Sequence, residues 1–408
     1  MRKNVLFVSL FAVCMNLYPQ LQNNGVISIK ENTEFSIYEN LYVHQNAEIV
    51  NNGEMYLFKN FSNNGNINFN DSQISSVFYL VGDEQQKING SGTSIFYDVE
   101  FNNLKGNHAF TLEKELNIYG TTFFVNGIVH ESEEGILTYH QDASYRYLKD
   151  ASYVNNKVNK IGDAAFTFPV GDFKEEEFVV RSASISAPDS IDDKFFVSFN
   201  WENSEVNFSS NQKEESIGLI DMNEYWEIKS NNTASSVAIT LTWNEVTTPD
   251  FILSNVDNMI IVRWNGEKWV DEGGVVNSLN NEITSLVSEY GVFSLAIKNT
   301  LVTDSNVDFD SSDSFSPNND GVNDFFVIPK LAEFYPNFKM KIYNRYGNIV
   351  YDYSNKGSLN PKWWDGKSYG RLTISSNDDL MPAATYWYIV DFNDGKTKPY
   401  QSWVYLNK

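Results

Sequence analysis

The side chains that could do chemistry in this 408-residue chain are few and scattered. Its four histidines do not have the spacing of metal ligands, and no Gly-x-Ser-x-Gly elbow, His-Glu-x-x-His zinc motif or phosphate-binding glycine loop is present. The histidines are His44, His108, His130 and His140. The 53 acidic residues would allow a pair of catalytic carboxylates, as in glycoside hydrolases, but no pattern marks such a pair. We therefore expect no enzyme and no cofactor, and keep a polysaccharide hydrolase as the alternative.

Oxygen-bearing side chains are concentrated in one segment, residues 316–326, around Gly321. Asn, Asp and Gly tolerate the positive φ of tight turns, and their side-chain oxygens accept hydrogen bonds from nearby main-chain N–H groups. The same oxygens of Asn318, Asp320 and Asp324 could bind Ca²⁺, although the spacing is shorter than an EF-hand loop and lacks its closing Glu. The sequence favours a structural turn, with Ca²⁺ as the alternative and no other metal expected.

Strand-like runs follow this turn. Residues 339–343 and 349–353 flank a turn and predict a hairpin, while residues 386–390 and 403–406 predict two further strands. Helical periodicity is absent from this part of the chain, so it predicts a small antiparallel sandwich.

At these motifs the segment 313–408 resembles the gliding-motility-associated C-terminal domain, also called the type B sorting domain of type IX secretion. The matching residues are Pro317, Asn318, Asp320, Gly321, Asn323 and Asp324 in the opening, Asn344, Arg345 and Gly347 in the hairpin turn, Trp364, Asp365 and Gly366 in the next turn, and Trp403 and Leu406 in the last strand. Ala384 and Ser402 stand where the family has glycines. The resemblance implies an Ig-like antiparallel β-sandwich that engages the outer-membrane type IX secretion machinery, and export to the cell surface or the medium.

The charge is divided unevenly between this segment and the rest of the chain. The whole chain has a formal charge of −23, whereas residues 313–408 have 10 acidic and 11 basic residues. The remaining residues therefore hold all of the net negative charge, which indicates an acidic cargo joined to a nearly neutral C-terminal module. An acidic surface is unsuited to nucleic acid, which proteins bind with clustered Lys and Arg.

The N-terminus has the pattern of a secretory signal. Two basic residues precede a short apolar run, which predicts a signal peptide over residues 1–20 and a route through the periplasm. The single cysteine, Cys14, lies inside this segment, and a lipidated Cys14 is the alternative. No second apolar stretch is long enough for a helical span, so we expect no transmembrane anchor.

The cargo divides into two β regions. Residues 21–145 show short strands separated by Asn-Gly turns, with an echo at a spacing of 12 residues, which predicts β-solenoid-like repeats, with plain hairpins as the alternative. Residues 146–299 have longer strands and an Asn265-Gly266 hairpin signal, which predicts a β-sandwich. Residues 300–312 are a polar linker.

The sequence therefore predicts an all-β secreted or cell-surface protein whose cargo is adhesin-like or structural. Five tryptophans occur at strand spacing, which favours a core position for them: Trp201, Trp226, Trp243, Trp264 and Trp269. An exposed row of tryptophans would instead indicate a carbohydrate-binding module, which is the alternative function. Besides the secretion machinery, a surface polysaccharide, a host surface or another substratum is a candidate partner.

Overall fold

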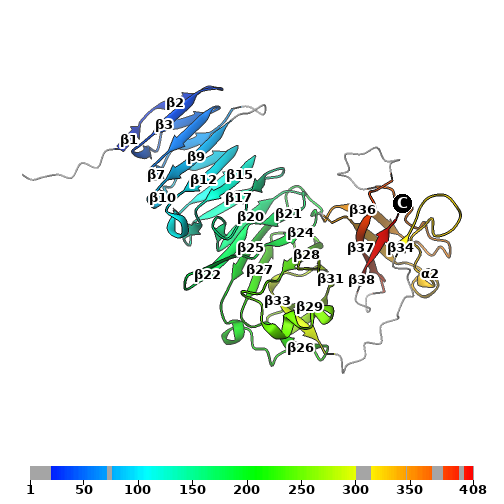
Figure 1. Cartoon of the computed structure of the whole chain (residues 1–408). Coiled ribbons are helices and arrows are strands. Elements are labelled where there is room, and N and C mark those ends of the chain that lie inside the picture. The colour runs from blue at the N-terminus through cyan, green and yellow to red at the C-terminus, as the bar shows by residue number, and fades with distance from the viewer. Residues whose placement is uncertain are drawn as a thin grey trace, which may run out of the picture.

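The computed structural model describes residues 20–70, 76–299, 314–345, 347–369, 380–394 and 399–407. The expected signal peptide apart from Gln20, with Cys14, and the expected linker at 300–312 lie outside these residues. Figure 1 shows a stack of β-coils that passes into a larger β region, with a smaller sheet beside it at the C-terminal end. The predicted all-β class, with solenoid, central sandwich and small C-terminal sandwich, is confirmed.

The N-terminal region is a stack of coils in which each coil contributes strands to three parallel sheets. All strand pairs within the stack are parallel. The first sheet holds β1 (Gln20–Asn23), β4 (Asn40–Val43), β7 (Phe61–Asn63), β10 (Gln86–Asn89), β13 (Phe110–Leu112), β16 (Val129–Glu131) and β19 (Val154–Asn155). The second holds β2 (Val26–Ile29), β5 (Glu48–Asn51), β8 (Asn66–Asn68), β11 (Thr93–Phe96), β14 (Glu115–Ile118), β17 (Ile136–Tyr139) and β20 (Lys157–Ile161). The third holds β3 (Glu34–Ile37), β6 (Glu54–Leu57), β9 (Val77–Gly82), β12 (Asp98–Asn103), β15 (Thr121–Asn126) and β18 (Ser144–Arg146).

Asn-Asn-Gly sequences form corners of the coils. At each corner the first Asn is buried, and its Oδ1 accepts from the glycine N–H two residues later while its Nδ2 donates to a carbonyl of another coil. For Asn63 these distances are 3.0 Å to Gly65 N and 2.8 Å to Thr93 O. The 12-residue echo therefore relates successive corners. It is not the coil period, because Ile49 pairs in register with Ile67, 18 residues further along.

The sandwich continues the solenoid without a break in the sheet. Leu116, Leu137, Val158 and Val197 pair one after another across β14, β17, β20 and β25 (Lys194–Asn200), and all four are buried. The second sheet then runs through β27 (Tyr225–Ser230), β33 (Gly291–Lys298), β29 (Met259–Trp264) and β30 (Trp269–Gly273), with β26 (Ile217–Ile220) beside β33. The first sheet ends in β22 (Val170–Lys174) and β23 (Glu177–Val180). One apolar core extends from coil to sandwich, so the two regions stabilise each other.

A fourth sheet closes the sandwich. It holds β21 (Phe166–Phe168), β24 (Ala183–Ile185), β28 (Val237–Thr242), β32 (Glu282–Val287) and β31 (Val275–Asn277), in that order. Short helices η1 (Gly106–His108), η2 (Ser204–Val206), α1 (Asp250–Leu253) and η3 (Val256–Asn258) lie in the connections. Trp226, Trp243 and Trp269 are buried, which confirms the core prediction for them. Trp201 and Trp264 are only partly buried and pack against the margin of the core, so the prediction holds in part for these two. The Asn265-Gly266 hairpin joins β29 to β30 as predicted.

The C-terminal domain has its own core. Its sheet has the order β34 (Ser314–Phe315), β38 (Tyr400–Leu406), β37 (Ala384–Asp391), β35 (Lys339–Tyr343) and β36 (Ile349–Ser354), and a short helix α2 (Leu331–Phe334) covers part of one face. The predicted hairpin is β35 and β36. One pair differs from the purely antiparallel expectation, because β34 lies parallel to β38.

Candidate functional site

The opening of the C-terminal domain is a turn whose side chains bind its own main chain. The Asp324 carboxylate accepts from the N–H groups of Asn319 at 2.7 Å and Gly321 at 2.8 Å. Asn318 Oδ1 accepts from the Asp320 N–H at 3.0 Å. A main-chain hydrogen bond and the Asn318 side chain lower the pKa of Asp320. The oxygens that define the motif are thus used to hold a backbone conformation.

Three residues of the opening have positive φ, at 62° for Asn319, 88° for Gly321 and 53° for Asn323. Asn and Gly adopt this region at low cost, which explains why these residue types occur here. The Asn323 carbonyl accepts from the Ser316 N–H at 2.9 Å and closes the loop. Among the described residues, no group of three or more His, Cys, Asp or Glu side chains is arranged to hold a metal ion.

Trp364 of the second turn lies at the centre of the domain and is fully buried. Its main-chain carbonyl accepts from the Phe326 N–H at 2.9 Å, and its indole N–H donates to the Lys367 carbonyl at 2.7 Å. The indole ring contacts the rings of Phe315 and Tyr386 at centroid distances of 5.1 and 5.0 Å. This residue therefore fixes the opening segment against the sheet.

Three motif elements that are far apart in the sequence meet at Gly366. A Cβ at this position would lie 2.9 Å from both Pro317 Cγ and Leu406 Cδ1, and the φ of Gly366 is +76°. A larger residue would therefore strain the backbone and force neighbouring side chains to shift. Beside it, Asp365 accepts from the Lys367 N–H at 3.2 Å. The structure thus brings the opening, the second turn and the final strand to one place.

The hairpin turn of the motif lies elsewhere. Asn344 Oδ1 accepts from the Asn348 N–H at 3.0 Å and closes the turn. Gly347 faces the cargo, because a Cβ there would be 3.4 Å from Ser186 Cα, and Arg345 lines a groove between the two units. Trp403 is also on this side and is 41% exposed.

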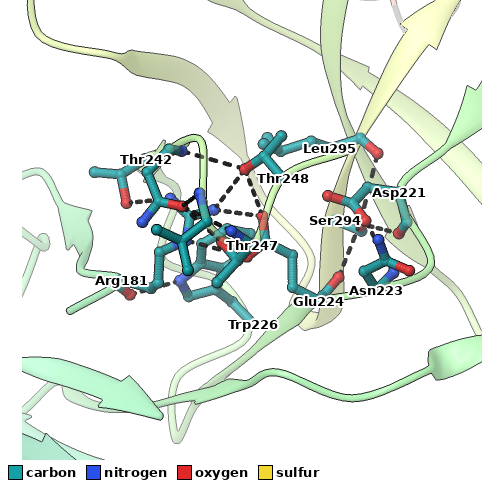
Figure 2. A network of polar contacts seen from close by, with 12 residues as sticks. Arg181, Asp221, Asn223, Glu224, Trp226, Thr242, Thr247, Thr248, Ser294 and Leu295 are labelled. Atoms are coloured by element: carbon teal, nitrogen blue, oxygen red, sulfur yellow. Dashed lines mark hydrogen bonds and ion pairs between the residues drawn. The ribbon is translucent and has the colours of Figure 1, made fainter. Parts of the chain in front are cut away.

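A second polar cluster lies inside the sandwich and contains two buried carboxyl groups, those of Asp221 and Glu224 (Figure 2). Arg181 donates from Nε and Nη2 to the two carboxylate oxygens of Glu224, at 3.1 and 2.5 Å, and both side chains are buried. The guanidinium also lies over the Trp226 ring, 4.9 Å from its centroid. Burial and the Glu224 carboxylate raise the pKa of the nearby Asp221 to about 8. The carboxyl groups of Asp221 and Glu224 are both buried, so the cluster has the geometry of a structural ion pair between Arg181 and Glu224.

Sequence reasoning missed this ion pair and the contact between the C-terminal domain and the cargo. Arg181 and Glu224 are 43 residues apart, and no local pattern joins them. A signal for the contact face did exist, since Trp387 alternates with the core residues Tyr386 and Tyr388 along β37 and so must point to the opposite face. None of the helices in the described ranges is long and apolar enough to cross a membrane.

Comparison with known proteins identifies the C-terminal domain. Residues 309–406 match the family model described as the CHU_C type IX secretion signal domain. Neither a curated protein nor a solved structure matches the chain. The match covers the opening turn, the hairpin, the Trp364 turn and the final strand described above. This chain therefore carries a C-terminal type IX secretion signal domain, which implies interaction with the type IX machinery and export to the cell surface or the medium.

Proposed function

We propose that the cargo is an adhesin-like surface protein without catalytic activity, delivered to the periplasm by the N-terminal signal segment before type IX export. The observation that carries the proposal is the unbroken sheet from the coils into the sandwich. The ladder from Leu116 to Val197 ties both regions through main-chain pairing and a common core. Such a body is a stiff spacer, and coils that contact only their neighbours suit a projecting element of an adhesin.

The outer surface of the solenoid supports a contact role. Aromatic rings of successive coils contact one another at one corner. Phe69 and Tyr97 meet edge to face at a centroid distance of 5.6 Å, and Tyr119 stacks on His140 at 4.0 Å. Tyr119 is 42% exposed. Aromatic rings that are packed on one side and open to solvent on the other are suited to contact surfaces.

Three experiments test the proposal at separate points. Protease accessibility in intact cells, comparing the full chain with a chain ending at Ser312, tests whether residues 313–408 direct export; equal exposure of both chains would contradict it. Attachment of cells to a solid surface, comparing a deletion strain with the complemented strain, tests the adhesive role. We expect the deletion strain to attach less, and attachment at the level of the parent strain would overturn the adhesin proposal. Release of reducing sugars from a polysaccharide by the purified protein would overturn its non-catalytic part.

A further inference from the structure

The C-terminal domain is docked on the sandwich by specific polar contacts. Gln401 of β38 accepts from the Leu286 N–H at 3.0 Å and donates to Ser285 Oγ at 3.1 Å. Both partners lie in β32, just after the residues that β31 covers, since β31 pairs only with residues 282–284. The glutamine side chain therefore occupies an open part of the sheet edge. Together with the packing of Gly347 against the sandwich, it sets the two units at a defined distance.

A groove of about 870 Å³ lies between the two units beside this contact. Its cargo wall is the outer face of the fourth sheet, where four hydroxyl side chains stand in register on four adjacent strands. They are Thr167, Ser184, Thr240 and Thr284. Within the row, Thr167 and Ser184 oxygens are 2.8 Å apart, and those of Thr240 and Thr284 are 2.7 Å apart. The wall is thus a line of groups that can each donate and accept hydrogen bonds.

The opposite wall is aromatic. Trp387 of β37 and Trp403 of β38 are cross-strand partners on the face away from the domain core, and both line the groove. Trp387 stacks on Tyr343 at a centroid distance of 4.1 Å and an interplanar angle of 7°. Trp387 is held in place by this stack, whereas Trp403 is 41% exposed. The two indoles therefore give this wall an apolar aromatic surface opposite the hydroxyl row, and Trp403 is its exposed part.

The charges in the groove define what it fits. Arg345 and Glu282 are the charged residues of its lining, one of each sign, and the protein as a whole is strongly acidic. A polyanion would be repelled by that overall charge. The Thr240 and Thr284 hydroxyls lie on the face of the sheet, not along a free main-chain edge, so this part of the wall does not offer the backbone pairing that an extended peptide uses. A neutral chain that has both apolar ring faces and many hydroxyl groups satisfies both walls.

We propose that this groove binds a segment of a neutral polysaccharide. Its sugar rings would lie against Trp387 and Trp403, and its hydroxyls would form hydrogen bonds with the row of four hydroxyl side chains that includes Thr240. The inference rests on the proposed adhesive function and deepens it by naming the ligand class. It also assigns the secretion signal domain a second role as one wall of the binding site.

The test is affinity electrophoresis of the purified full chain in native gels containing laminarin, hydroxyethylcellulose or glucomannan. We expect at least one of these neutral polysaccharides to retard the protein, and pectin, a polyanion, to give no retardation. Trp403→Ala should weaken binding about tenfold and Thr240→Val about fivefold. Thr240→Val keeps the side-chain shape, so it serves if Trp403→Ala lowers stability. The matched controls are Tyr38→Ala, an exposed solenoid aromatic, and Thr111→Val, a solenoid hydroxyl, both expected to bind like the parent.

Three outcomes would overturn the inference: no retardation by any neutral polysaccharide, unchanged binding of both groove variants, or preferential binding of an extended peptide. Because the gel assay uses purified protein, its failure is distinguishable from failure of the adhesion assay. Cells could still attach through another surface, in which case the adhesin proposal would stand without this groove.

Discussion

The buried ion pair of the sandwich gives a sharp test of what holds the cargo together. Arg181 makes hydrogen bonds to Glu224 and, through Nη1, to the Thr242 hydroxyl at 3.1 Å. Replacing it with methionine keeps much of the side-chain length over Trp226 and removes the positive charge. The Glu224 carboxylate would then stay buried without its positive partner, while the Thr248 hydroxyl still donates to it at 2.8 Å (Figure 2).

The expected loss follows from the burial of both groups. Removing one partner of a buried ion pair costs about 3–5 kcal/mol of unfolding free energy, because the other charge is left without compensation. An unfolding entropy of roughly 2.1 cal/mol/K per residue over roughly 280 residues of solenoid and sandwich gives about 0.6 kcal/mol/K. Arg181→Met should therefore lower the Tm of this unit by about 5–8 °C.

Differential scanning calorimetry at pH 7 measures the change. The control is Arg146→Met, in which the arginine is exposed on the solenoid and the expected effect is within about 0.5 kcal/mol. The double variant Arg181→Met/Glu224→Leu should be more stable than Arg181→Met, since no buried charge is left unpaired. A Tm for Arg181→Met equal to that of the control, or a double-variant loss equal to the sum of the two single losses, would refute the reasoning.

Three further predictions follow from the site and the fold. Asp221→Asn should remove a pH dependence of the unfolding free energy. The folded chain keeps the Asp221 proton up to about pH 8, whereas the unfolded chain releases it near pH 4. The unfolding free energy of the parent therefore falls as pH rises through this window, by up to about 1.4 kcal/mol per pH unit. Urea unfolding at pH 5 and pH 7.5 should show the variant gaining on the parent, and a constant difference would contradict the assignment. Asn63→Ala should lower the unfolding free energy by about 2–4 kcal/mol, because Gly65 N–H and Thr93 C=O lose their partner. The control Asn24→Ala, at an exposed position of the same motif, should be neutral. Equal urea midpoints for the two variants would count against the corner role of Asn63. Asp324→Ala should speed hydrogen exchange of the Asn319 and Gly321 amides about fivefold or more, and Asp324→Asn should give rates between those of the parent and the alanine variant. Unchanged exchange in the alanine variant would show that the carboxylate does not hold the turn.

In the C-terminal domain, patterns of adjacent residues predicted some elements of the fold but not their packing. Its opening turn, its hairpin and its last two strands were predictable because each depends on a few adjacent residues: φ preferences at Asn319 and Gly321, and alternation along β37. The convergence of Pro317, Gly366 and Leu406 was not predictable in this way. It arises when the chain closes on itself, which no short window contains.

In the cargo, the sequence by itself determined the class of local structure. The Asn-Asn-Gly corners and the absence of helical periodicity specify short strands and tight turns, because these are properties of the residues themselves. Only the tertiary structure decided the coil period, the passage of one sheet from Leu116 to Val197, the Arg181 ion pair and the groove below Trp403. Each of these joins residues distant in the chain, and their pairing is selected by burial and hydrogen-bond satisfaction over the whole fold.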